Sequence, residues 1–196
     1  NSGGDINEGI EVAGLAGTNL ACYDLISYNG SGGASYNTIT LSGTIPDEGC
    51  GYGAVWFAIP GLQNGAADGI ALHNTCTNTL IEFLNYEGTT FSATNGPANT
   101  VTSTNIGVTE TGTTPVGQSL QLTGSGNTSS AFTWTAPSLA SIGLLNAGQS
   151  ITPCGASNTI TTGLVSGGPY TVDCTNSLTD AGSVAFLSTG TFNAGN

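Results

Sequence analysis

The stretch Val55-Trp56-Phe57-Ala58-Ile59 decides the class of fold. Val55, Phe57 and Ile59 alternate with neighbours that point to the other side of the chain, which is the period of a β-strand. The same alternation recurs along the whole sequence, at Ile10 and Val12, Ile39 and Leu41, Leu120 and Leu122, and Val184 and Phe186. Thr, Val, Tyr, Phe and Ile dominate these runs, as is typical of pleated, half-buried strands.

Turn-forming sequences separate these runs, among them Asn29-Gly30, Pro46-Asp47 and Gly167-Gly168-Pro169. They divide the chain into strands predicted near residues 9–13, 20–28, 36–42, 52–59, 68–73, 79–86, 116–123, 130–135, 158–165, 169–174 and 183–190. Two glycine-free windows, 18–29 and 70–87, are long enough for helices but lack a 3.6-residue apolar stripe, so we expect strands there. Many short strands at regular spacing predict an all-β chain folded as a β-sandwich.

The charge of the chain excludes several classes of function. Among 196 residues there are 12 acidic side chains, one His and no Lys or Arg, which gives a formal net charge of −12. Nucleic-acid binding, phosphate clamps and Schiff-base chemistry depend on Lys or Arg, so we expect no nucleic-acid partner. The longest apolar stretches, such as 54–60, are too short to cross a bilayer, so we expect no membrane insertion either.

A change of composition divides the chain near residue 148. Residues 136–149 are small, proline-containing and irregular, and the segment beyond them has two cysteines and no Trp. We therefore predict a main β-sandwich over residues 1–148 and a β-rich C-terminal extension over 149–196. The extension is expected to form a β-hairpin around residues 167–169.

The cysteines indicate an extracellular protein. There are five of them, at Cys22, Cys50, Cys76, Cys154 and Cys174, and no C-x-x-C spacing that would favour zinc. Scattered cysteines in a chain rich in Gly, Ser, Thr and Asn are typical of secreted or cell-surface proteins. We predict a Cys154–Cys174 bridge, because both residues flank the expected hairpin, and a Cys22–Cys50 bridge with Cys76 left over. A Cys50–Cys76 bridge is the alternative.

Several stretches carry a resemblance to a known family. They are 1–5 (NSGGD), 8–12 (EGIEV), 41–46 (LSGTIP), 61–65 (GLQNG), 68–72 (DGIAL), 83–88 (FLNYEG), 119–122 (SLQL) and 132–134 (FTW). In this order they resemble the lamin-tail domain, an immunoglobulin-like sandwich, in the form found in secreted bacterial proteins. The resemblance implies a non-catalytic module that accompanies extracellular nucleases or adhesins. Members of the family normally begin with one further strand before the position of Asn1. The resemblance therefore also implies that one strand position of the sandwich is unfilled.

The densest group of carboxylates is the best candidate for a metal site. Asp5, Glu8 and Glu11 lie close together in sequence, beside Asn1 and Asn7, in a glycine-containing segment. Oxygen ligands of this kind suit Ca²⁺, whose charge would offset their mutual repulsion, so we consider a Ca²⁺ site at these residues. The alternative is a solvated loop in which Glu11 accepts hydrogen bonds from nearby backbone amides.

An enzymatic interpretation finds little support in the sequence. His73 is the only imidazole, with Asp68 five residues before it, but no G-x-S-x-G nucleophile elbow is present. A hydrogen-bonded histidine at a strand end is the simpler interpretation. We therefore assign no catalytic residues and expect the chain not to be an enzyme.

Two functional hypotheses of different kinds follow from the sequence. The first is a non-catalytic extracellular module that binds protein partners. A weaker variant of it is an accessory domain of a secreted nuclease. The second is a subunit of an extracellular filament that assembles with copies of itself by β-strand exchange. The donor strand would be residues 183–191, in which Val184 and Phe186 would point to one side.

Overall fold

The computed structural model of this protein describes residues 7–63, 65 and 67–152. Asp5, Cys154, Cys174, Val184, Phe186 and the predicted C-terminal hairpin lie outside the described residues. The described chain is all-β, as predicted, with two short 3-10 helices, Leu20–Cys22 and Ser129–Ala131. Its strands are β1 (Gly9–Leu15), β2 (Tyr23–Asn29), β3 (Ala34–Thr40), β4 (Tyr52–Ala58), β5 (Gly69–Asn74), β6 (Thr79–Asn85), β7 (Thr104–Asn105), β8 (Gln118–Gly126), β9 (Phe132–Leu139) and β10 (Gln149–Ile151).

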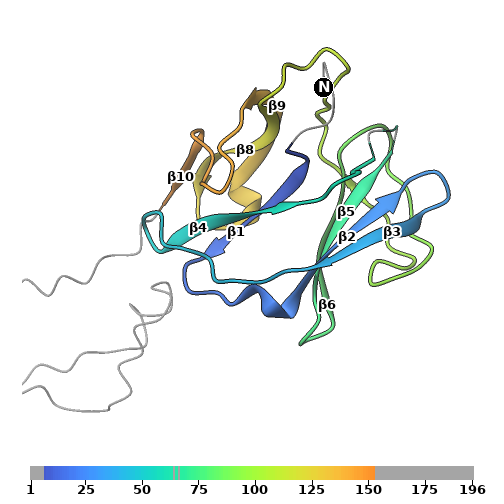
Figure 1. Ribbon diagram of the computed structural model, residues 1–196, viewed down its shortest axis with the longest axis horizontal. Helices are drawn as coiled ribbons and strands as arrows, with labels where there is room; N and C mark the ends of the chain where they lie inside the picture. Colours follow the sequence, from blue (N-terminus) through green and yellow to red (C-terminus); the bar gives the residue numbers. More distant parts are fainter. Residues whose placement is uncertain (1–6, 64, 66, 153–196) are drawn as a thin grey trace, which may run out of the picture.

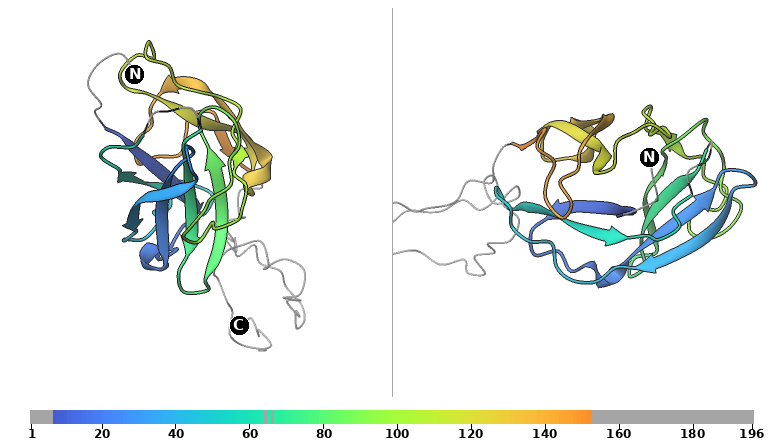
Figure 2. Two further views of the ribbon diagram at one scale, coloured as in Figure 1. Left: turned by 90° about the vertical axis from the view of Figure 1, so that its right-hand side faces the viewer. Right: turned by 45° about the horizontal axis from the view of Figure 1, so that its top comes forward.

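The strands form three sheets (Figure 1). The large sheet has the order β3-β2-β5-β6-β7, the small sheet has the order β10-β8-β9, and β1 and β4 form an antiparallel two-stranded ribbon. The ribbon runs between the large sheet at one end of the molecule and the small sheet at the other (Figure 1). Figure 2 shows the small sheet lying over the ribbon. The ribbon therefore has neighbours in the sandwich on both of its faces.

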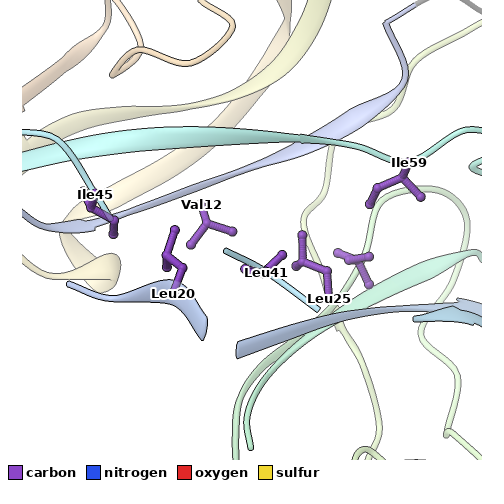
Figure 3. Close-up of a cluster of buried hydrophobic side chains, with 7 residues drawn as sticks. Val12, Leu20, Leu25, Leu41, Ile45 and Ile59 are labelled. Carbon is purple, nitrogen blue, oxygen red and sulfur yellow. The ribbon is translucent and has the colours of Figure 1, made fainter. Parts of the chain in front are cut away.

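The main core lies between the ribbon and the large sheet. It contains Val12 from β1, Leu25 from β2 and Ile70 from β5, and it is closed by Leu20, Leu41, Ile45 and Ile59 from the connections (Figure 3). A second cluster, built on Tyr28, Ile26, Ala71 and Phe83, lies on the opposite face of the large sheet under Ala93 and Ala98. Because both faces of the large sheet are covered, residues 25–28 of β2 are buried without alternation.

Several element boundaries differ from the predictions and β7 was not predicted, and two of the differences bear on the architecture. The predicted strand 20–28 begins only at Tyr23, because Asn19 caps a 3-10 turn by accepting a hydrogen bond from the backbone N–H of Ala21 at 3.0 Å. At the other end, β10 lies beyond the predicted domain boundary at residue 148 and pairs with β8 in parallel. The first residues of the predicted extension thus belong to the small sheet.

Candidate functional site

The two described residues of the predicted calcium site do not converge. Glu8 and Glu11 are three residues apart on extended chain, so their side chains point to opposite faces of the ribbon. A Glu8 carboxylate oxygen accepts the backbone N–H of Gly61 at 2.8 Å, and a Glu11 oxygen accepts that of Gly143 at 2.7 Å. Within the described ranges, no three His, Cys, Asp or Glu side chains are placed to hold a metal ion. Glu8 and Glu11 therefore do not form a shared site in the described part of the chain, and the predicted calcium site with Asp5 stays a prediction.

Glu11 and Glu48 together fasten the loop between β9 and β10 to the ribbon. Glu11 accepts the N–H of Gly143, which is 132 residues away in sequence, and Glu48 Oε2 accepts the N–H of Leu145 at 2.6 Å. Glu48 Oε1 accepts the N–H of Ala54 on β4 at 2.7 Å. We call Glu11, Glu48 and these three amides the amide clasp. It holds the small sheet to the ribbon through charge-assisted hydrogen bonds.

Burial dominates the electrostatics of the clasp. It raises the pKa of the Glu11 carboxyl above its ordinary value, and the negative charge of Glu48 raises it further. The hydrogen bonds from the amides of Gly143 and Leu144 lower this pKa but do not outweigh the burial. A chain without Lys or Arg has no side-chain cation of that kind to offset the repulsion. Backbone N–H groups are thus the only donors that the clasp uses.

Two aspartates hold glycine-rich loops in the same way. Asp68 is buried and accepts the backbone N–H groups of Gly30 at 3.2 Å and Gly65 at 2.9 Å. Asp47 accepts those of Gly49 at 2.9 Å and Gly51 at 3.2 Å. Gly49 and Gly51 both have positive φ, which glycine adopts without strain, so this loop can fold back onto the carboxylate. Asp47 and Asp68 therefore act as acceptors for the backbone.

The raised pKa values of several acidic groups predict an unusual dependence of stability on pH. Burial also raises the pKa of Glu87 and of Glu110, and the charges of Asp68 and Glu110 raise that of Glu87 further. Carboxyls with a raised pKa keep their protons in the folded protein at pH values where the unfolded chain, with an ordinary value of 4.5, has released them. The free energy of unfolding therefore falls as the pH rises through this window.

We accordingly expect the protein to be more stable at mildly acidic pH than at neutral pH. Urea denaturation followed by fluorescence across this pH range measures the difference. Glu87→Gln should flatten the slope, because it removes one of the groups that release a proton. A free energy of unfolding that drops steadily from neutral pH downwards would contradict this account.

His73 is buried in β5 as part of the large sheet. Its Nε2 lies 3.1 Å from Asn78 Oδ1, and in the register it lies opposite Asp24 on β2. His73 Nδ1 and Asp24 Oδ1 are buried without a hydrogen-bond partner. Asp68, which the sequence places near His73, lies just before the other end of β5 and is bonded to loop amides. Asp68 and His73 therefore do not form a catalytic pair.

The predicted bridge between Cys22 and Cys50 is wrong. Cys22 is bonded to Cys76, with a Cα–Cα distance of 5.4 Å. Cys22 immediately precedes β2, Cys76 follows β5, and these strands are antiparallel neighbours whose register places Tyr23 opposite Asn74. The bridge therefore closes the end of the strand pair, and Cys76 is not the left-over thiol. Cys50 lies in the connection between β3 and β4.

The most important residue that the sequence did not single out is Glu48. It follows Pro46-Asp47, which predicts a turn, and nothing nearby in sequence points to Leu145 as its partner. The one available signal is composition, because in a chain without Lys and Arg a half-buried carboxylate must find N–H or O–H donors.

Comparison of the chain with protein-family models, with curated proteins and with solved structures returned no match. The resemblance to the lamin-tail domain therefore stays a prediction from the sequence. In the described part of the chain, no helix is long and apolar enough to span a bilayer.

Proposed function

We propose that this protein is a non-catalytic extracellular β-sandwich module with a structural or protein-interaction role. The observation that carries the proposal is that five of its carboxylates accept hydrogen bonds from backbone amides. Acidic side chains are the groups that acid–base or metal chemistry would need, and here Glu8, Glu11, Asp47, Glu48 and Asp68 all accept hydrogen bonds from backbone amides. The Cys22–Cys76 bridge supports an oxidising compartment, and the resemblance to lamin-tail domains supports the same role.

A panel assay tests this proposal. We expect no turnover of glycoside, ester, peptide or phosphodiester substrates, with or without Ca²⁺, Mg²⁺ or Zn²⁺. Turnover that scales with protein concentration and disappears in His73→Gln would contradict the proposal. DNA and RNA should not be retained at physiological salt, since the chain has no Lys or Arg to release counterions. Retention in metal-free buffer would favour the nuclease-accessory role instead.

A second candidate function is that of a filament subunit that assembles by β-strand exchange. The observation that favours it is the two-stranded ribbon, which no third strand extends among the described residues. Residues 183–191, with Val184 and Phe186, are the predicted donor and lie outside the described residues. Light scattering of the full chain over a range of concentrations tests assembly. A chain that stays monomeric throughout would rule this candidate out.

A further inference from the structure

The outer edge of β1 is open. The hydrogen bonds from Ala16 N to Gly51 O and from Ile59 N to Glu8 O identify the bonded pairs of the ribbon. In an antiparallel pair the bonded residues alternate with residues whose N–H and C=O point outward. Gly9, Glu11 and Ala13 are therefore outward-facing residues of β1, as is Leu15 at its end. The outward backbone groups of Gly9, Glu11 and Ala13 have no hydrogen-bond partner among the described residues, whereas the C=O of Leu15 accepts the N–H of Thr18 at 3.2 Å.

Most of the other described edges carry a feature that obstructs strand addition. On β4, the N–H of Ala54 is taken by Glu48 Oε1, and the C=O of Tyr52 accepts the N–H of Glu48 at 2.9 Å. On β3, the N–H of Ser35 is taken by Asn95 Oδ1 at 2.8 Å. Edge strand β9 contains Pro137, which has no N–H to donate. Natural sheets protect their edges in these ways, and β7 and β10 are only two and three residues long.

Apart from the contact of the Leu15 C=O at its end, the edge of β1 has none of these features. The strand is seven residues long and contains no proline. Ala13 is exposed, and Leu15 is 43% exposed although it is a large apolar residue. A strand that is long, regular and unprotected at its edge is a template for pairing with another strand.

We propose that the edge of β1 accepts residues 183–191 of this chain as an added strand. The described chain ends at Thr152, and residues 153–196 follow it. In that part, residues 183–191 contain the apolar run 184–187 (VAFL) and no Asp or Glu. An uncharged strand adds no repulsion beside Glu11, in a chain of net charge −12. This inference rests on the strand-exchange proposal for the identity of the donor strand. It adds to that proposal by naming β1 as the acceptor.

Amide hydrogen exchange tests the inference at the residues concerned. In the full chain, the N–H groups of Glu11 and Ala13 should be protected, and deleting residues 180–196 should speed their exchange by about tenfold or more. The N–H of Val12, an inward-facing residue bonded to β4, should exchange at the same rate in both chains and serves as the internal reference. Unprotected Glu11 and Ala13 amides in the full chain would overturn the inference.

A pair of substitutions at one position gives the second test. Ala13→Pro removes an outward N–H that has no described partner, so the ribbon itself should keep its bonds. The matched control, Ala13→Val, keeps the N–H and favours a strand. We expect Ala13→Pro to speed exchange at Glu11 and to abolish any assembly, whereas Ala13→Val leaves both unchanged.

Ala13→Pro and the deletion of residues 180–196 together separate this inference from the filament proposal. Assembly that persists in Ala13→Pro but is lost on deleting residues 180–196 would overturn β1 as the acceptor and keep strand exchange. Protection of Glu11 and Ala13 in a chain that is monomeric at all concentrations would support β1 as the acceptor and overturn the filament. If Ala13→Pro does not fold, the exchange measurement on the full and shortened chains decides alone.

Discussion

Replacing both Cys22 and Cys76 by alanine is expected to lower the free energy of unfolding by about 4 kcal/mol. The bridge joins residues 54 apart in sequence. Without it, the unfolded chain recovers the freedom of a loop of that length, and a chain-entropy treatment gives a loss of this size. Equilibrium denaturation of the oxidised wild type and of the double variant, in the same buffer, measures the difference.

Thr77→Ala is the matched control for this prediction, because Thr77 lies in the same turn and the substitution leaves the bridge intact. Its side chain is exposed and bonds only to Thr79, so we expect a change of less than about 0.5 kcal/mol. Peptide mapping without reduction should recover Cys22 linked to Cys76. A Cys22–Cys50 peptide, or a double variant as stable as the wild type, would contradict the pairing.

Glu48→Ala is expected to lower the free energy of unfolding by about 3 kcal/mol. The substitution leaves the N–H groups of Ala54 and Leu145 without their acceptors, and it removes one of the two carboxylates that hold the β9–β10 loop. Hydrogen bonds to charged groups contribute about 1.5–3 kcal/mol each, and water entering the vacated space offsets part of the loss. Thermal and urea unfolding of the two proteins measure the effect.

Glu48→Gln separates the hydrogen bonds from the space that the side chain fills. A glutamine keeps one acceptor oxygen and turns an NH₂ group toward the other amide. We therefore expect its free energy of unfolding to lie between those of the wild type and Glu48→Ala. Equal and small losses in both variants would mean that the clasp does not hold the small sheet to the ribbon.

Strand positions follow from the sequence because alternation is a local property. Val55, Phe57 and Ile59 lie on or next to β4, as their spacing predicts, and the glycine-free windows are mainly strands. The burial of residues 25–28 in β2 could not be predicted, because it depends on a second cluster that segments far along the chain place over the large sheet. A periodic pattern identifies a strand but not the number of its faces that are covered.

The site depends on contacts that no local pattern encodes. Pairing of Cys22 with Cys76 follows from the register between β2 and β5, and sequence spacing alone favoured a different partner. Of the predicted cluster of Asp5, Glu8 and Glu11, the two described members do not come together, because extended chain sends their side chains to opposite faces. The sequence did suggest backbone amides as partners for Glu11, but not that the amide would belong to Gly143.

The central claim is that Glu8, Glu11 and Glu48 serve backbone amides and that they do so without a metal ion. Amide hydrogen exchange at Gly61, Gly143 and Leu145 tests it most directly, since Glu8, Glu11 and Glu48 accept these N–H groups. We predict that all three amides are protected in the wild type, with or without Ca²⁺. Each should lose its protection when its own carboxylate is replaced by alanine. Rapid exchange of these amides in the wild type, or protection that appears only when Ca²⁺ is added, would contradict the account.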